Sequence, residues 1–227
     1  MIFDLLKGDL TSVLIRLLLV MPSILIALTF HEFAHGFIAN KLGDPTAKNL
    51  GRLTLNPLKH LDPIGTLMML FVGIGYAKPV PINSRYFKKP KRDMALTALA
   101  GPAMNLILSF AGVTIYSVYL TFFGSNNYIT YAVYVFFYYF AYLNAYLAIF
   151  NLMPIPPFDG SRIALVLLPD KYYWGIMKYE RTIMIVTIVV LLGLSRIGLN
   201  PFSRLVELYV GGVEAMYSKI FALVLGH

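Results

Sequence analysis

A long stretch without charge most constrains how this chain can fold. Residues 94–158, which separate Asp93 from Asp159, contain no Asp, Glu, Lys, Arg or His. A water-soluble domain cannot easily bury such a segment, whereas a lipid bilayer accommodates it. Over the whole chain 58% of residues are hydrophobic and 13% are charged, roughly half the charged fraction of soluble proteins. The sequence therefore predicts an integral membrane protein.

The apolar segments predict an all-α polytopic membrane protein, with about five to six transmembrane helices in a single domain over residues 1–227. Residues 64–74 are apolar but too short to cross as a helix, so with the turn-rich residues up to 81 they predict a re-entrant loop or β-hairpin segment. Residues 202–225 fit either an interfacial or partner-facing helix or a further span. The segments long enough to span are 10–42, 94–123, 128–153 and 182–199.

Basic residues account for the net charge of +8 and predict the orientation. Lys and Arg gather in the loops of a membrane protein that face the cytoplasm. We therefore expect a multi-pass protein of the cell membrane with a cytoplasmic-side active site. The loop residues concerned are Lys41, Lys48, Arg52 and Lys59, then Arg85, Lys88, Lys89, Lys91 and Arg92, and finally Lys171, Lys178 and Arg181.

Other features exclude several classes of function. No basic-aromatic module accompanies the positive charge, so nucleic-acid binding is not expected. The absence of cysteine excludes disulfides and thiol chemistry. The N-terminus lacks the pattern of a cleaved signal peptide, so the first apolar segment is expected to be retained.

The motif that carries chemistry is His31-Glu32-Phe33-Ala34-His35. Histidines four residues apart lie on one face of a helix, where both imidazoles can bind one zinc ion. Glu32 projects beside such an ion, where it can take a proton from water and pass it to a leaving amine. This is the arrangement of HExxH metallopeptidases.

A catalytic zinc needs a third protein ligand and an open position. Asp159 is the best candidate, because it ends the uncharged stretch and follows a proline run that must stop the preceding helix. Capping of the helix that starts near Ser161 is its alternative role. His60 is a rival ligand, although its polar, basic loop favours a surface or gating role.

Asn105, Asn144 and Asn151 lie in the predicted spans 94–123 and 128–153. The amides of Asn105 and Asn151 could contact a substrate carbonyl or stabilise an oxyanion. Hydrogen bonding between helices is the alternative for both residues, since Asn commonly does this in membranes. We expect only the interhelical role for Asn144.

Together these residues resemble the site-2 protease family of intramembrane zinc metalloproteases. The resemblance covers residues 20–165, without the PDZ or CBS domains of some subgroups, and so indicates a minimal form. It implies one Zn²⁺ per chain held by His31, His35 and Asp159. The matching elements are His31–His35, Asn56–Pro63, Gly75–Pro81, Ala100–Asn105 and Asn151–Gly160.

The resemblance also implies roles for the remaining residues. Glu32 becomes the base, Asn151 a substrate or oxyanion contact, and Asn105 an active-site neighbour that contacts substrate. The extended segment after the re-entrant loop offers backbone for strand addition to an unwound substrate helix. Its candidate substrate-binding residues are Gly75, Lys78, Pro79 and Val80.

The expected function is hydrolysis of peptide bonds in or near transmembrane helices of membrane-protein substrates, as in regulated intramembrane proteolysis. The expected partners are those substrates and the lipid bilayer, and the sequence leaves the oligomeric state open. A membrane metal transporter or metal sensor, in which Glu32 would be a ligand or proton relay, is one alternative. A relative that binds peptides without cutting them is another.

Overall fold

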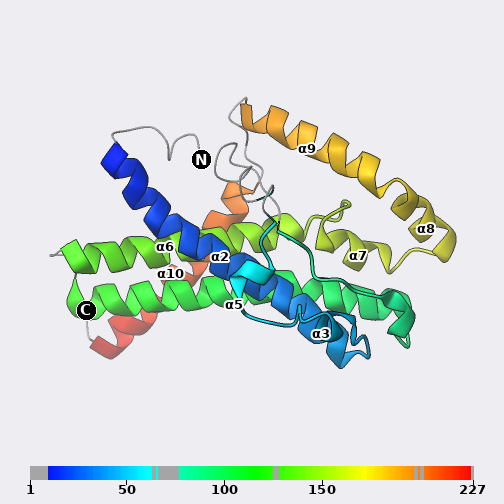
Figure 1. The fold of residues 1–227 in the computed structure, drawn as a ribbon. Helices are drawn as coiled ribbons and strands as arrows, with labels where there is room; N and C mark the ends of the chain where they lie inside the picture. The colour runs from blue at the N-terminus through cyan, green and yellow to red at the C-terminus, as the bar shows by residue number, and fades with distance from the viewer. Residues whose placement is uncertain are drawn as a thin grey trace.

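The computed structural model describes residues 10–62, 65, 77–124, 128–196, 199 and 202–225. Within these residues the chain is helical, and the only β pairing is one antiparallel bridge between Leu61 and Ala77. The predicted all-α class is confirmed for this part of the chain. The helices (Figure 1) are α2 (Leu10–Lys41), α3 (Thr46–Asn49), η1 (Pro57–Lys59), η2 (Ser84–Tyr86), α5 (Pro90–Phe123), α6 (Tyr128–Asn151), α7 (Asp159–Leu165), α8 (Asp170–Lys178), α9 (Glu180–Arg196) and α10 (Ser203–Leu225).

Three of these helices are long and apolar enough to cross a membrane: residues Leu18–Lys41 of α2, and the whole of α5 and α6. The 34 residues of α5 extend over roughly 51 Å at 1.5 Å per residue, which exceeds the hydrocarbon core of a bilayer. These helices correspond to the first three predicted spans. The fourth predicted span, 182–199, is the shorter helix α9, which has 17 residues.

The outward faces of the helices carry large apolar side chains. Ile107 on α5, Ile129 on α6 and Val189 on α9 are 61%, 74% and 63% exposed. Contiguous exposed apolar surface is uncommon on soluble proteins, whereas lipid chains solvate it favourably. The chain is therefore a membrane protein by the composition of its surface as well as of its sequence.

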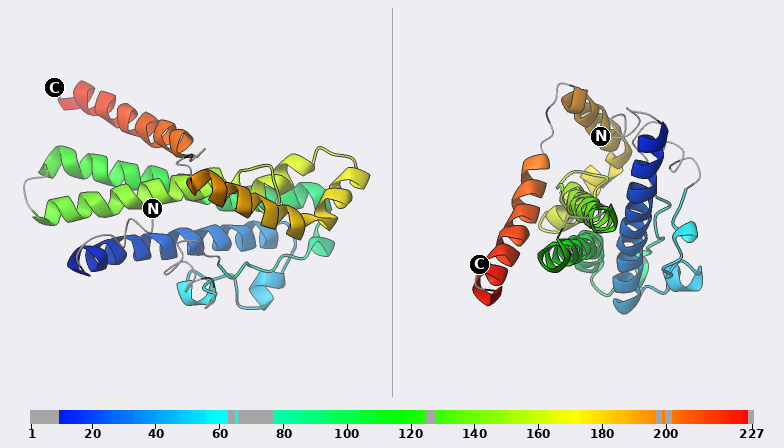
Figure 2. Two further views of the ribbon diagram at one scale, coloured as in Figure 1. Left: turned by 90° about the horizontal axis from the view of Figure 1, so that it is seen from above. Right: turned by 90° about the vertical axis from the view of Figure 1, so that its left-hand side faces the viewer.

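Helices α5 and α6 lie side by side at the centre of the molecule, with α2 on one side and α10 on the other (Figure 2). Small residues allow the central pair to approach closely. A Cβ added at Gly112 of α5 would lie 3.1 Å from both the Ala141 Cβ and the Phe140 ring of α6. The Ser109 hydroxyl, one turn away, donates to the Ala141 carbonyl over 2.7 Å. Such packing holds helices together where no hydrophobic effect acts between them.

Residues 202–225, for which the sequence left two interpretations, form α10 and pack along α5 and α6. Val206 and Val210 are buried against the central pair. The Tyr116 hydroxyl of α5 donates to the Glu214 carboxylate, and the Tyr209 hydroxyl donates to the Leu106 carbonyl over 2.9 Å. This helix is thus an integral part of the bundle.

The loops after α2 fold back along that helix. The fully buried Asp44 accepts hydrogen bonds from Thr46 and from the Asn83 backbone N–H, the latter over 2.7 Å. His60 is only 1% exposed, and its Nε2 lies 2.8 Å from the Thr54 carbonyl. The expected surface position of His60 is therefore wrong, because the ring is buried and hydrogen-bonded within its own loop.

The predicted re-entrant segment falls almost entirely outside the described residues. Of residues 64–76 only Gly65 is described, and its backbone N–H donates to Asp62 over 2.9 Å. The chain is described again from Ala77 onward, as an extended segment that runs beside α2 to η2.

The contact at Gly112 gives a prediction about stability. Gly112→Leu should destabilise the helix bundle by about 1–3 kcal/mol, because an added side chain must displace Ala141 and Phe140. The measurement is unfolding of the purified protein in detergent by heat or by a denaturing detergent.

Gly212→Leu is the matched control, since a Cβ there meets nothing within 4 Å. It adds the same apolar side chain to a helix without the clash. Equal stability of the two variants would contradict the close α5–α6 packing.

Candidate metal centre

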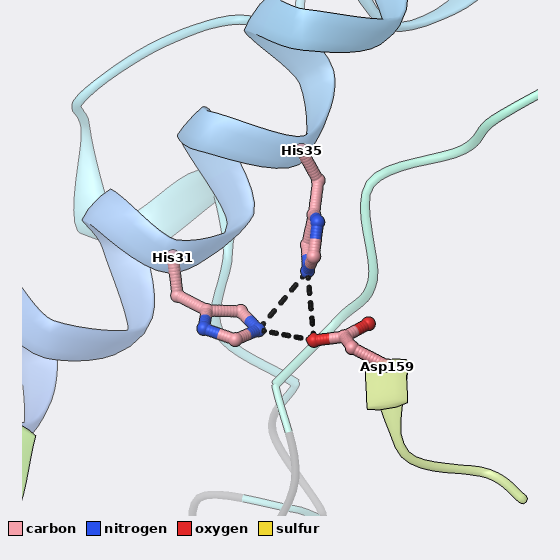
Figure 3. Close-up of side chains that lie close together, drawn as sticks. All are labelled: His31, His35 and Asp159. Atoms are coloured by element: carbon pink, nitrogen blue, oxygen red, sulfur yellow. Dashed lines mark hydrogen bonds and ion pairs between the residues drawn. The ribbon is translucent and has the colours of Figure 1, made fainter. Parts of the chain in front are cut away.

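Helix α2 carries the two motif histidines one turn apart on its inner face. The Nε2 atoms of His31 and His35 lie 3.0 Å apart. Their residues are only 7% and 6% exposed. Figure 3 shows both rings turned toward the same point, which they share with Asp159. Because His31 and His35 are four residues apart on one helix, their imidazoles point to the same place, as predicted.

Asp159 reaches this point from the beginning of α7. Its Oδ2 atom lies 3.1 Å from His31 Nε2 and 3.2 Å from His35 Nε2. The proline-rich residues 154–157 follow the end of α6, since proline cannot continue a helix. Gly160 permits a tight return, because a Cβ there would overlap the Leu152 carbonyl. The turn that places Asp159 beside the histidines therefore requires glycine at position 160.

The hydrogen bonds behind the histidines fix which ring nitrogen carries a proton. His35 Nδ1 lies 2.7 Å from the Thr97 carbonyl, and His31 Nδ1 lies 2.6 Å from the Asn105 side-chain oxygen. A carbonyl oxygen can only accept, so each Nδ1 must donate. In the neutral rings both Nε2 atoms therefore present lone pairs to each other and to Asp159.

Three electron-rich atoms within 3.0–3.2 Å of one another repel unless a proton or a metal ion lies between them. Asp159 Oδ2 is buried and has no hydrogen-bond partner among the described residues. Ligands about 2.0–2.1 Å from a tetrahedral zinc lie about 3.3 Å apart, close to the spacing here. Two imidazoles and one carboxylate, a donor set found in catalytic zinc sites, thus fit the ion.

The same surroundings set the charge of the carboxylate. Burial by itself would raise the pKa of Asp159, but hydrogen bonds and positive charge from the two imidazoles, when a proton lies between them and the carboxylate, lower it by more, so that this pKa lies well below its usual range. Asp159 is therefore ionised at neutral pH, as a metal ligand must be.

Helix α5 approaches the imidazoles at a glycine. A Cβ on Gly101 would lie 2.5 Å from His35 Nε2 and 2.6 Å from His31 Cε1, inside the van der Waals distance. No other residue fits here without movement of both rings. The Ala-Gly-Pro sequence at positions 100–102 therefore brings the helix backbone directly against the histidines.

Glu32 lies beside the cluster and is not part of it. The group of possible metal ligands comprises His31, His35 and Asp159, while Glu32 Oε2 accepts a hydrogen bond from the Val80 backbone N–H over 2.7 Å. The glutamate thus contacts the extended segment 77–83.

Asn105 is completely buried, and both ends of its amide are engaged. Its oxygen contacts His31, and its nitrogen donates to the Ala27 carbonyl over 3.2 Å and to Asn144 Oδ1 over 2.8 Å. In this arrangement the amide orients a histidine, and the contact of Asn105 with substrate stays a prediction. Asn144 has the interhelical role that was expected of it.

Asn151 ends α6, and its amide nitrogen donates to the Leu147 carbonyl one turn earlier, over 2.9 Å. Among the described residues, the Asn151 side chain has no hydrogen bond to either histidine. Gly75 lies outside the described residues. Lys78 and Pro79 are exposed and Val80 is buried beside Glu32.

Sequence reasoning missed two features of the centre. The contact of Thr97 with His35 comes from a backbone carbonyl, which leaves no mark in residue type. Gly101 lies in a motif that the resemblance included, and its place in that motif was the signal that its lack of a side chain matters.

Comparisons with known proteins identify a family and several relatives of this chain. Residues 117–194 match the model of peptidase family M50, a region that contains Asp159 but not the two histidines. YwhC of Bacillus subtilis, named as a candidate zinc metalloprotease, is 46% identical over 149 residues, which cover 65% of this chain and 68% of YwhC. No solved structure matches the chain significantly.

More distant relatives carry similar names. Rip2 of Mycolicibacterium smegmatis is 31% identical over 151 residues, or 63% of this chain and 54% of Rip2. MJ0611 of Methanocaldococcus jannaschii is 28% identical over 148 residues, or 65% of this chain and 68% of MJ0611. Both are named as candidate zinc metalloproteases, and the chain spans only about half the length of Rip2.

The extent of the match to YwhC, together with the family model, is sufficient to assign the chain to a protein family. This chain belongs to peptidase family M50, the family of site-2 proteases.

Proposed function

We propose that this chain is an intramembrane zinc metalloprotease that hydrolyses peptide bonds in or near the transmembrane helices of other membrane proteins. The observation that carries this proposal is the buried convergence of His31, His35 and Asp159 beside Glu32. The cluster lies between helices that are long and apolar enough to span a bilayer. Membership of family M50 and the names of the relatives support the same activity.

One zinc ion per chain would be held by His31, His35 and Asp159. A zinc ion bound there supplies Lewis-acid chemistry, which activates water and polarises the carbonyl of the peptide bond to be cut. The role of the three side chains is to fix the ion and leave one coordination position open. The histidines are almost fully buried and Asp159 is partly buried, so electrostatic interactions inside the site are stronger than in bulk water.

Glu32 would act as general base and then as general acid. Its carboxylate is held by the Val80 N–H over 2.7 Å, which leaves its other oxygen to accept a proton from water. Transfer of that proton to the leaving amine completes hydrolysis. Asn151, which lies eight residues before Asp159 in the sequence, remains our candidate for a contact with substrate or the oxyanion.

Residues Lys78, Pro79 and Val80 are our candidate segment for binding an unwound substrate. The N–H groups of this segment are already in use: Lys78 donates to the His60 carbonyl over 2.8 Å and Val80 donates to Glu32, while Pro79 has none. A substrate strand can therefore pair with it only by donating its own N–H groups to carbonyls. This limits strand addition to one half of the usual hydrogen-bond ladder.

The topology that we propose is a single multi-pass domain in the cell membrane, with five or six spans and the re-entrant segment near residues 64–81. The site would face the cytoplasmic side. Thr97, which supports His35, lies only seven residues after the first residue of α5, close to the basic loop that contains Lys88, Lys89 and Arg92. Water would reach the cluster through the loops at this end.

The decisive experiment combines Glu32→Gln with removal of the metal. Purified protein would be reconstituted with a helical membrane substrate, and products would be identified by mass spectrometry. Chelation should abolish cleavage, and added zinc should restore it. Glu32→Gln should lower the cleavage rate by at least about a hundredfold while the zinc content stays unchanged, because this residue transfers protons and is not a ligand.

Glu207→Gln on the exposed face of α10 is the matched control and should cleave at the parental rate. A Glu32→Gln protein as active as the parent would contradict the proposed protease mechanism. If zinc binds but nothing tested is cut, peptide binding without cleavage is favoured. Zinc flux across vesicles would favour a transporter.

Removal of the third ligand should act on metal content directly. Asp159→Ala should weaken zinc binding by more than about a hundredfold, since loss of a direct ligand exceeds the effect of supporting residues. Metal content after dialysis against a zinc buffer measures this. Asp170→Ala, which removes an exposed carboxylate paired with Lys91, is the control, and equal zinc loss in the two variants would refute the assignment.

The hydrogen bond from Val80 to Glu32 can be tested by removing the donor alone. Val80→Pro deletes the N–H, and kcat should fall by on the order of tenfold, which corresponds to one hydrogen bond to a charged group. Val80→Ala keeps the N–H and should retain a higher kcat, with any change mainly in KM. Equal values of kcat for the two variants would show that this N–H does not position Glu32.

A further inference from the structure

The polar side chains between the three central helices form one continuous chain. It begins at the Phe140 carbonyl of α6, which accepts from Asn144 Nδ2 over 2.8 Å. Asn144 Oδ1 accepts from Asn105 Nδ2 over 2.8 Å, and Asn105 Oδ1 lies 2.6 Å from His31 Nδ1. Both asparagines have no exposed surface, so every polar atom in the chain depends on its neighbour.

The direction of each hydrogen bond in this chain is forced. A backbone carbonyl can only accept, so the Asn144 amide must turn its nitrogen to Phe140 and its oxygen to α5. That oxygen, together with the Ala27 carbonyl, requires the nitrogen of Asn105. Asn105 must then present its oxygen to His31, whose Nδ1 becomes the donor. The ring therefore offers the lone pair of Nε2 to the metal centre.

The second histidine is supported differently. His35 Nδ1 lies 2.7 Å from the Thr97 backbone carbonyl, so its tautomer is set by the helix itself. Only His31 depends on side chains for its orientation. Helix α6 can therefore influence the metal centre through a residue that touches neither zinc ligand nor substrate.

We propose that Asn144 is a positioning residue, which acts through Asn105 to hold His31 in the tautomer and orientation that bind zinc. This inference rests on the proposed function, because it takes the His31–His35–Asp159 cluster to be a zinc site. Partners that orient a ligating histidine typically contribute ten- to a hundredfold to metal affinity. In a membrane an interhelical hydrogen bond also stabilises packing, so the test must separate the two effects.

The test compares zinc affinities of purified full-length protein in detergent, measured by competition with a fluorescent chelator. Asn105→Leu should weaken zinc binding by about ten- to a hundredfold. Asn144→Leu should weaken it by about three- to tenfold, less because the Ala27 carbonyl still holds the Asn105 amide. The double variant should bind zinc no more weakly than Asn105→Leu alone, since Asn144 acts only through Asn105.

Ser109→Ala is the matched control. It removes another fully buried hydrogen bond between α5 and α6, from the Ser109 hydroxyl to the Ala141 carbonyl, which does not lead to a histidine. Thermal unfolding of the zinc-free proteins should show similar losses for Ser109→Ala and Asn144→Leu, whereas only Asn144→Leu should lose zinc affinity. Asn144→Asp loses the donor to the Phe140 carbonyl but keeps the oxygen that accepts from Asn105, and should bind zinc more tightly than Asn144→Leu.

Three outcomes would overturn the inference. Equal zinc affinity of Asn144→Leu and Ser109→Ala would mean that Asn144 contributes only to helix packing and does not position His31. Additive losses in the double variant would mean that Asn144 does not act through Asn105. Equal zinc affinity of Asn144→Asp and Asn144→Leu would mean that the accepting oxygen has no role. A parent protein that binds no zinc would overturn the proposed function as well, so the two failures are distinguishable.

Discussion

The central constraint on this structure is that the fold holds three electron-rich atoms together although they repel one another. Two imidazole nitrogens and a carboxylate oxygen lie 3.0–3.2 Å apart in a buried site. Without a cation this arrangement is costly, since like charges and lone pairs interact strongly at low dielectric. The arrangement therefore favours a positive charge at this point, carried by a proton or a metal ion, and the surrounding elements impose the convergence.

Each part of the convergence comes from a different element. Helix α2 supplies both histidines, while α5 supports them with the Thr97 carbonyl and the Asn105 amide and approaches them at Gly101. The return to Asp159 requires the end of α6 and the absence of a side chain at Gly160. Packing of α2, α5 and α6 thus builds the centre, and its geometry reports directly on their correct arrangement.

The sequence predicts those parts of this centre that follow from local rules. The helical period brings His31 to His35, and the break of a long uncharged stretch marks Asp159. The contacts that orient these residues cannot be predicted in this way, because they join residues far apart. Asn105 contacts a histidine 74 positions earlier, and Val80 contacts Glu32 across 48 positions.

The same distinction applies to the fold. Long apolar segments predicted the helices at the centre, whereas the packing of α10 and the burial of His60 depend on tertiary contacts. In sequence, a histidine in a polar loop resembles a surface residue, and nothing local predicts that the His60 ring is buried and hydrogen-bonded to the Thr54 backbone carbonyl.

X-ray absorption at the zinc edge of the purified protein tests the central claim most directly. The arrangement of His31, His35 and Asp159 predicts one zinc per chain, with two imidazole nitrogens and oxygen donors at about 2.0–2.2 Å. The outer-shell scattering of two imidazole rings should be visible in the parent, and one ring should be lost in His35→Ala. A spectrum without imidazole scattering, or one that His35→Ala leaves unchanged, would contradict a metal centre at this site.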